Sequence, residues 1–137
     1  MSTVKELILE TEGNAHMIDI TEEIRAFVIK AGIKTGSVTV FVQGSTGAVT
    51  TIEYEPNLVK DFREAMERIA PADSDYHHHQ TWGDYNGHSH IRASVVGPSE
   101  TIPVISGEPV LGTWQQIVVI DFDTSPRQRK VVLCARG

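Results

Sequence analysis

The sequence of 137 residues is poor in cysteine, in positive charge and in long apolar runs. With Cys134 as its single cysteine the chain can form no internal disulfide, which fits a reducing compartment, and we expect a cytoplasmic protein. No run approaches the roughly 20 apolar residues that span a bilayer, so we expect no membrane partner. Only 12 Lys and Arg stand against 18 Asp and Glu, and this net charge of −6 argues against a nucleic-acid partner. The small basic run at 127–130 follows Asp121 and Asp123, and we interpret it as a solvated strand end rather than a phosphate site.

Strand patterns account for most of what is present. The segment 37–43 is rich in β-branched residues, which is typical of a strand. The apolar run 114–122 is typical of a central strand that needs cover on both faces, which weakly favours an oligomer. A turn signal at Gly13-Asn14 predicts that 16–20 is the hairpin partner of 3–11. Further strands are expected up to about Tyr54 and over 100–105, 109–111 and 129–135.

Apolar residues at helical spacing predict two helices, and 90–96 could form a third. The first begins with Thr21 as its N-cap and is closed by Gly32 at the C′ position. The second runs over 56–69, with an apolar face and a charged face. Many strands with two or three short helices predict one α+β domain, residues 1–137, with a mainly antiparallel sheet core.

Histidine is concentrated in one segment, residues 76–90. Imidazole is the commonest metal ligand and the side chain that titrates nearest neutral pH. We expect this segment to be a loop of about 15 residues, and ordered loops of that length are usually functional. Its histidines, which are five of the six in the chain, are His77, His78, His79, His88 and His90.

The spacing of these histidines favours a metal site. In an extended segment residues i and i+2 point to one side, so His88 and His90 can face a common centre. His78 could complete the three ligands of a catalytic zinc site, and Asp84 could orient an imidazole or act as general base. We expect a divalent metal ion, zinc above all, with magnesium as the choice for a diphosphate substrate. The residue types alone also allow a metal-free acid–base or phosphate site, or plain surface histidines.

Other polar residues could complete the site. Ser45 and Thr46 lie in a glycine-flanked loop whose amides could cradle an anion, although an ordinary turn has the same composition. Arg92 suits recognition of a phosphate. Glu53 lies on the polar face of its strand and Gln115 beside an apolar run, where each could equally be solvated.

Four segments of the chain resemble the YjbQ family. The resemblance covers nearly the whole chain, and the segments that carry it stand in family order: FVQGSTGAVTTIEYEP at 41–56, WGDYNGHSHIRAS at 82–94, GPS at 97–99 and LGTWQQI at 111–117. Two positions depart from the family pattern. Many members have His at position 44, where this chain has Gly44, and Gly at position 85, where it has Tyr85.

The resemblance implies a fold, an assembly and an activity. It implies a β-sandwich, jelly-roll-like core and a homotrimer with sites near subunit boundaries. It implies chemistry like that of secondary thiamine-phosphate synthases, in which thiamine phosphate formation could be a side activity. The alternatives are a metal-dependent hydrolase or lyase acting on a small phosphorylated metabolite, and a non-catalytic metal- or ligand-binding trimer. The residues expected at the site are His78, His88 and His90 for the metal, Glu53 and Asp84 for catalysis, and Ser45, Thr46, Asn86, Arg92 and Gln115 for the substrate.

Overall fold

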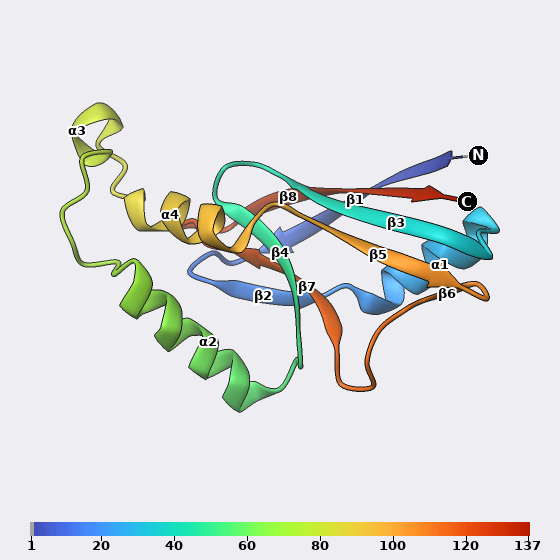
Figure 1. Cartoon of the computed structure of the whole chain (residues 1–137). Helices are drawn as coiled ribbons and strands as arrows, with labels where there is room; N and C mark the ends of the chain where they lie inside the picture. The colour runs from blue at the N-terminus through green and yellow to red at the C-terminus, as the bar shows by residue number, and fades with distance from the viewer. Residues whose placement is uncertain (1) are drawn as a thin grey trace.

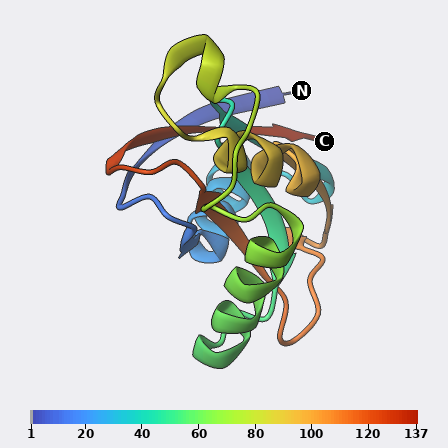
Figure 2. The same ribbon diagram turned by 90° about the vertical axis from the view of Figure 1, so that its left-hand side faces the viewer.

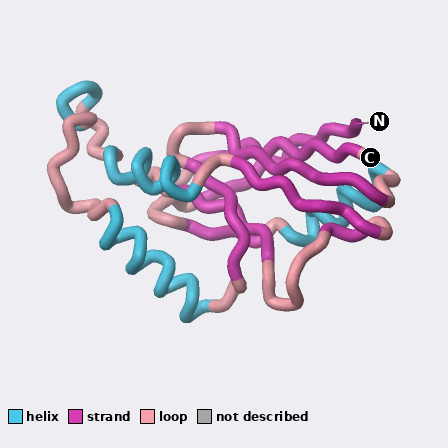
Figure 3. The backbone as a smooth tube through the Cα atoms, viewed as in Figure 1, coloured by secondary structure: helices cyan, strands magenta, loops and turns pink. Residues whose placement is uncertain are grey.

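The computed structural model describes residues 2–137 as two antiparallel sheets with helices at their edges (Figures 1 and 3). The larger sheet has the order β1-β8-β3-β5-β6 and the smaller sheet the order β2-β7-β4. The predicted α+β sandwich with an antiparallel core is therefore confirmed. The strands are β1 (Ser2–Thr11), β2 (His16–Asp19), β3 (Thr35–Gln43), β4 (Gly47–Ile52), β5 (Ser99–Ile105), β6 (Glu108–Pro109), β7 (Gln116–Asp121) and β8 (Arg127–Arg136).

The helices divide into one that joins the two sheets and three that lie on the other side of the molecule (Figures 1 and 2). The second predicted helix, 56–69, matches α2. Gly32 closes α1 as predicted, and its φ of 71° is left-handed. No helix of residues 2–137 is long and apolar enough to cross a membrane. The helices are α1 (Thr21–Ala31), α2 (Pro56–Ile69), α3 (His79–Trp82) and α4 (Gly87–Val96).

Two apolar clusters cover the two faces of β7. On one face Ile117 and Val119 pack in the cluster shared with β3, β8 and α1. On the other face Phe122, which follows the strand, stacks with Phe62 of α2 at a ring-centroid distance of 6.2 Å, in the cluster that also holds Ala93 of α4. The larger sheet and α1 thus cover one face of the apolar run and α2 and α4 cover the other, so this strand gives no reason to expect a partner subunit.

Two local predictions are wrong. Strand β2 is not the hairpin partner of β1, because β1 pairs with β8 and β2 pairs with β7 in the other sheet. The turn contains Gly13 and Asn14, both at positive φ, and it carries the chain from one sheet to the other. Thr21 does not cap α1, because its hydroxyl donates to Asp19 at 2.6 Å and accepts from the Ile117 amide at 2.9 Å.

Candidate functional site

The histidine segment is partly helical rather than an extended loop. It forms the short α3 and then enters α4 at Gly87, three residues before the predicted start. The early start needs a glycine, because a Cβ at position 87 would lie 2.6 Å from the Cβ of Tyr76. On a helix, residues i and i+2 are turned about 200° apart, so His88 and His90 face different surroundings. The prediction that both point to one side of an extended segment is wrong.

A cavity of about 360 Å³ opens at the end of the sandwich next to α4. Its lining includes two residues that the sequence did not indicate, Asp123 and Arg127. Another hollow, of about 400 Å³, lies between β1 and α1, but its lining holds neither a histidine nor a carboxylate. Six of the ten predicted site residues line the first cavity: Ser45, Thr46, His78, Asp84, Asn86 and His90.

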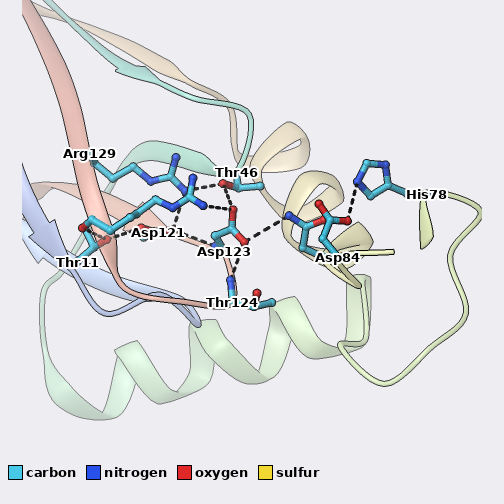
Figure 4. A network of polar contacts seen from close by, with 10 residues as sticks. Thr11, Thr46, His78, Asp84, Asp121, Asp123, Thr124 and Arg129 are labelled. Atoms are coloured by element: carbon cyan, nitrogen blue, oxygen red, sulfur yellow. Dashed lines mark hydrogen bonds and ion pairs between the residues drawn. The ribbon is translucent and has the colours of Figure 1, made fainter. Parts of the chain in front are cut away.

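Three of these residues form a set of nitrogen and oxygen donors. The Nε2 atom of His78 lies 3.6 Å from Oδ1 of Asp84 (Figure 4). The rings of His78 and His90 have centroids 4.6 Å apart. Two ligands of one tetrahedral zinc ion lie about 3.3 Å apart, which is close to the first distance. The His78 Nε2 atom is also buried without a hydrogen-bond partner, as is Oδ1 of Asn86. Within residues 2–137, however, no three His, Cys, Asp or Glu side chains are already grouped closely enough to hold a metal.

His88 lies apart from the cavity lining. It is buried, its Nδ1 atom has no hydrogen-bond partner, and its ring is 6.4 Å from that of Tyr76. Burial lowers the pKa of His88 below its ordinary value, and the nearby charge of Arg92 lowers it further. His88 is therefore a neutral imidazole at neutral pH, on the inner side of α4.

Arg92 is also buried away from the cavity. Its Nε donates to the carbonyl of Ala70 at 2.9 Å, and its Nη2 pairs with Glu67 at 2.6 Å. These contacts tie α4 to the end of α2. In this arrangement Arg92 holds two helices together and does not line the cavity.

Glu53 and Gln115 lie at the opposite end of the smaller sheet. Strand β4 pairs with β7 so that its first residue meets Asp121 and its last meets Gln116. Glu53 follows that last residue, and Gln115 donates to the Thr51 hydroxyl at 3.0 Å. The length of β7 therefore separates these two residues from the cavity within one chain.

A buried polar network lies next to the cavity, on the side away from His78 and Asp84 (Figure 4). Arg129 pairs with Asp121 at 2.7 Å, and their side chains are 3% and 0% exposed. Thr11 donates to Asp121 from the end of β1, and Arg129 also donates to the Thr46 hydroxyl. Burial raises the pKa of Asp121, but the hydrogen bonds from Arg129, Thr11 and the Asp123 amide outweigh it, so the pKa lies below its ordinary value.

Asp123 connects this network to the cavity. It accepts hydrogen bonds from the Thr46 hydroxyl at 2.8 Å, the Asn86 amide at 3.3 Å and the Thr124 backbone at 2.8 Å. Arg127 pairs with it at 3.1 Å. Burial raises the pKa of Asp123, but these hydrogen bonds and the Arg127 charge lower it below the ordinary value. The signal in the sequence was a carboxylate directly after the apolar run, which is costly to bury unless it has partners.

Comparisons with known proteins identify the family of the chain. Residues 5–137 match the family described as UPF0047 protein YjbQ-like. The chain belongs to the YjbQ family. A UPF0047 protein of Methanothermobacter thermautotrophicus is 37% identical over 133 residues, which cover 97% of this chain and 91% of that one. The UPF0047 protein YugU of Bacillus subtilis is 32% identical and covers 98% of this chain and 99% of its own length.

Solved YjbQ-like structures share the fold. The crystal structure of a YjbQ-like protein of unknown function from Sulfolobus solfataricus has a TM-score of 0.94 at 28% identity, covering 100% of this chain and 98% of that one. An uncharacterised YjbQ/UPF0047 protein from Clostridium acetobutylicum has a TM-score of 0.88 at 33% identity, covering 96% and 99%.

Both positions that depart from the YjbQ pattern, Gly44 and Tyr85, have a positive φ. Tyr85 has a φ of 55°, a left-handed conformation that suits the glycine common at this position. Gly44 has a φ of 126°, and a Cβ there would lie 2.5 Å from Nη1 of Arg129. A side chain at position 44 therefore meets the buried guanidinium.

Proposed function

We propose that this YjbQ-family chain is a metal-dependent enzyme that acts on a small phosphorylated metabolite in the cavity beside α4. The supporting observation is the approach of His78 to Asp84 and to the ring of His90. A cavity of about 360 Å³ is at the small end of ligand sites, which span roughly 300–1,000 Å³. Thiamine phosphate formation, implied by the family resemblance, is the first reaction to assay.

The donor atoms suit zinc better than magnesium. Imidazole and carboxylate are ordinary zinc ligands, whereas magnesium prefers oxygen ligands alone. We assign His78, His90 and Asp84 as the residues that would hold the ion. His88, the third imidazole predicted from the sequence, would have to leave its buried position on α4 to join them. A bound divalent ion would stabilise negative charge that develops on a phosphoryl group.

The neighbouring residues orient the substrate. The unpaired Oδ1 of Asn86 can accept a hydrogen bond from a substrate N–H or O–H group. Ser45 is exposed at the rim and offers a hydroxyl. Thr46 is different, because its hydroxyl already donates to Asp123 and accepts from Arg129.

Metal content is the direct test of this proposal. Tag-free protein is loaded with zinc, passed through a desalting column and measured by elemental analysis, with His78→Ala beside His77→Ala. His77 is the adjacent histidine, is exposed and does not line the cavity. We expect about one zinc per wild-type and His77→Ala chain and little retained zinc in His78→Ala, because loss of a ligand should weaken zinc binding by at least the roughly 10- to 100-fold that loss of an outer-shell partner costs. Equal zinc content in the two variants contradicts the ligand assignment, and zinc without turnover of any phosphorylated metabolite contradicts the enzyme.

We also propose that the complete site forms between copies of this chain arranged head to tail in a closed trimer. Exposed aromatic residues support this at both ends of the molecule: Trp114 is 71% exposed near Glu53 and Gln115, and Trp82 is 75% exposed at the cavity. Head-to-tail contacts close into rings when the rotation permits. In such a ring, Glu53 and Gln115 of one copy reach the cavity of the next.

Light scattering at micromolar concentration tests the assembly. We expect a trimer for wild type and dissociation for Trp114→Ser. The control is Ile29→Ser, because Ile29 is an apolar residue of α1 that is 65% exposed. This variant should remain a trimer. A stable wild-type monomer overturns the proposal.

A further inference from the structure

The cavity beside α4 contains one permanently charged cation whose role the family match does not assign. Arg127 begins β8 and lines the cavity with the donor set of His78, Asp84 and His90. Of the cavity-lining residues in the described chain, it alone is Lys or Arg. From the sequence we interpret the basic run at 127–130 as a solvated strand end, whereas the fold places its first residue, Arg127, in the cavity lining.

Arg127 is held in place on one side and open on the other. Its Nη2 pairs with Oδ2 of Asp123 at 3.1 Å, while its side chain stays 41% exposed. A guanidinium has five N–H donors in a planar fork, so the pair with Asp123 leaves donors for a ligand. The side chain is thus oriented before any ligand arrives, which lowers the entropy cost of binding.

Asp123 cannot serve as a free base here, because each of its oxygens is occupied. Oδ1 accepts from Asn86 and Thr124, and Oδ2 accepts from Thr46 and faces Arg127. Beneath it, the buried pair of Asp121 and Arg129 fixes the Thr46 hydroxyl. The network therefore acts as a rigid support for Arg127.

We propose that Arg127, positioned by Asp123, binds the phosphoryl group of the substrate, with Ser45 at the rim as a second donor. The proposal rests on the metal-dependent function proposed above, and it names a phosphate monoester or diphosphate as the substrate class. Arg92 does not share the task in this arrangement, since it is buried between α4 and α2 and does not line the cavity.

Charge makes the anion site dependent on the metal. Without an ion, Asp84 and Asp123 outnumber Arg127 in the cavity, and an anion meets net negative charge. A divalent cation reverses that balance. The affinity for phosphate should therefore rise when zinc is loaded. Arg127 should contribute the directed hydrogen bonds to the phosphate.

The test is calorimetric titration of inorganic pyrophosphate into wild type, Arg127→Ala, Arg127→Lys and Arg68→Ala, each with and without bound zinc. Arg68 is the matched control, because it is exposed on α2 and does not line the cavity. We expect Arg127→Ala to weaken pyrophosphate binding about 10- to 100-fold, the range of a hydrogen bond to a charged group. Arg127→Lys should keep part of the affinity because it keeps the charge without the fork. Arg68→Ala should bind as wild type does.

Zinc content separates this inference from the proposed function. Removing a positive charge should leave zinc content of Arg127→Ala at the wild-type level. If zinc binds and Arg127→Ala binds pyrophosphate like wild type, the inference fails while the metal proposal stands. If zinc does not bind wild type but Arg127→Ala still abolishes pyrophosphate binding, the anion site stands and the metal proposal fails. If wild type binds no pyrophosphate in either state, the inference is overturned.

Discussion

The buried ion pair next to the cavity can be broken at Arg129, which does not itself line the cavity but donates to the lining residue Thr46. Replacing Arg129 with methionine keeps much of the side-chain volume and leaves Asp121 buried, with hydrogen bonds only from Thr11 and the Asp123 amide. Taking one partner from a buried pair costs about 3–5 kcal/mol, and the two remaining hydrogen bonds put this case near the low end, at about 3 kcal/mol. Against a total stability of roughly 5–15 kcal/mol this is a large loss, and it lowers Tm by about 10 °C.

The neighbouring residue supplies the control. Lys130 follows Arg129 on β8 but points to the opposite face, where it pairs with Glu6 at 3.6 Å with both side chains largely exposed. Lys130→Met should cost less than about 1 kcal/mol, as surface pairs do. Urea unfolding followed by circular dichroism at pH 7 gives both values. If Arg129→Met costs no more than Lys130→Met, the pair contributes nothing net to folding and the reasoning is refuted.

Three further predictions concern acid, packing and backbone strain. The pKa of Asp121 is lowered on folding, so its stabilisation is complete above the unfolded pKa of about 3.9 and is lost as the pH falls through the lower folded pKa. The urea midpoint of wild type should therefore fall more steeply than that of Asp121→Asn below about pH 4, and parallel curves would contradict this. Gly87→Ala should destabilise by about 1–3 kcal/mol in thermal unfolding, because its Cβ would meet Tyr76 at 2.6 Å, and an unchanged Tm would count against the packing. Tyr85→Val should destabilise by at least about 1 kcal/mol at a φ of 55°, while Tyr85→Asn stays within about 0.5 kcal/mol; equal effects would show that the backbone conformation is not the cause.

Regular elements were predictable where one physical signal dominates. The amphipathic pattern of 56–69, opened by Pro56, gave α2 with its bounds. The start of α4 was not predictable in the same way, because Gly87, His88 and Ser89 are weak helix formers and show no apolar spacing. Packing of Gly87 against Tyr76 decides that start, and this is a tertiary contact.

The candidate site was predictable in part for a similar reason. Its histidines and Asp84 are close together in sequence and carry a recognisable chemistry. Asp123 follows β7 and Arg127 begins β8, and the pairing of β7 with β4 and of β8 with β3 brings both residues to the site. The local sequence predicts helices, strands and clusters of reactive side chains from residue type and periodicity. Which strands pair with one another depends on the whole fold.

The contact between Gly44 and Arg129 has a consequence for how such sequences can change. A side chain at position 44 would enter the space that the Arg129 guanidinium occupies, and the backbone there is left-handed at a φ of 126°. A histidine at position 44 would therefore force the Arg129 guanidinium to move, or would require a shorter side chain at position 129. We expect Gly44→His to be more harmful alone than when the residue at position 129 is shortened with it.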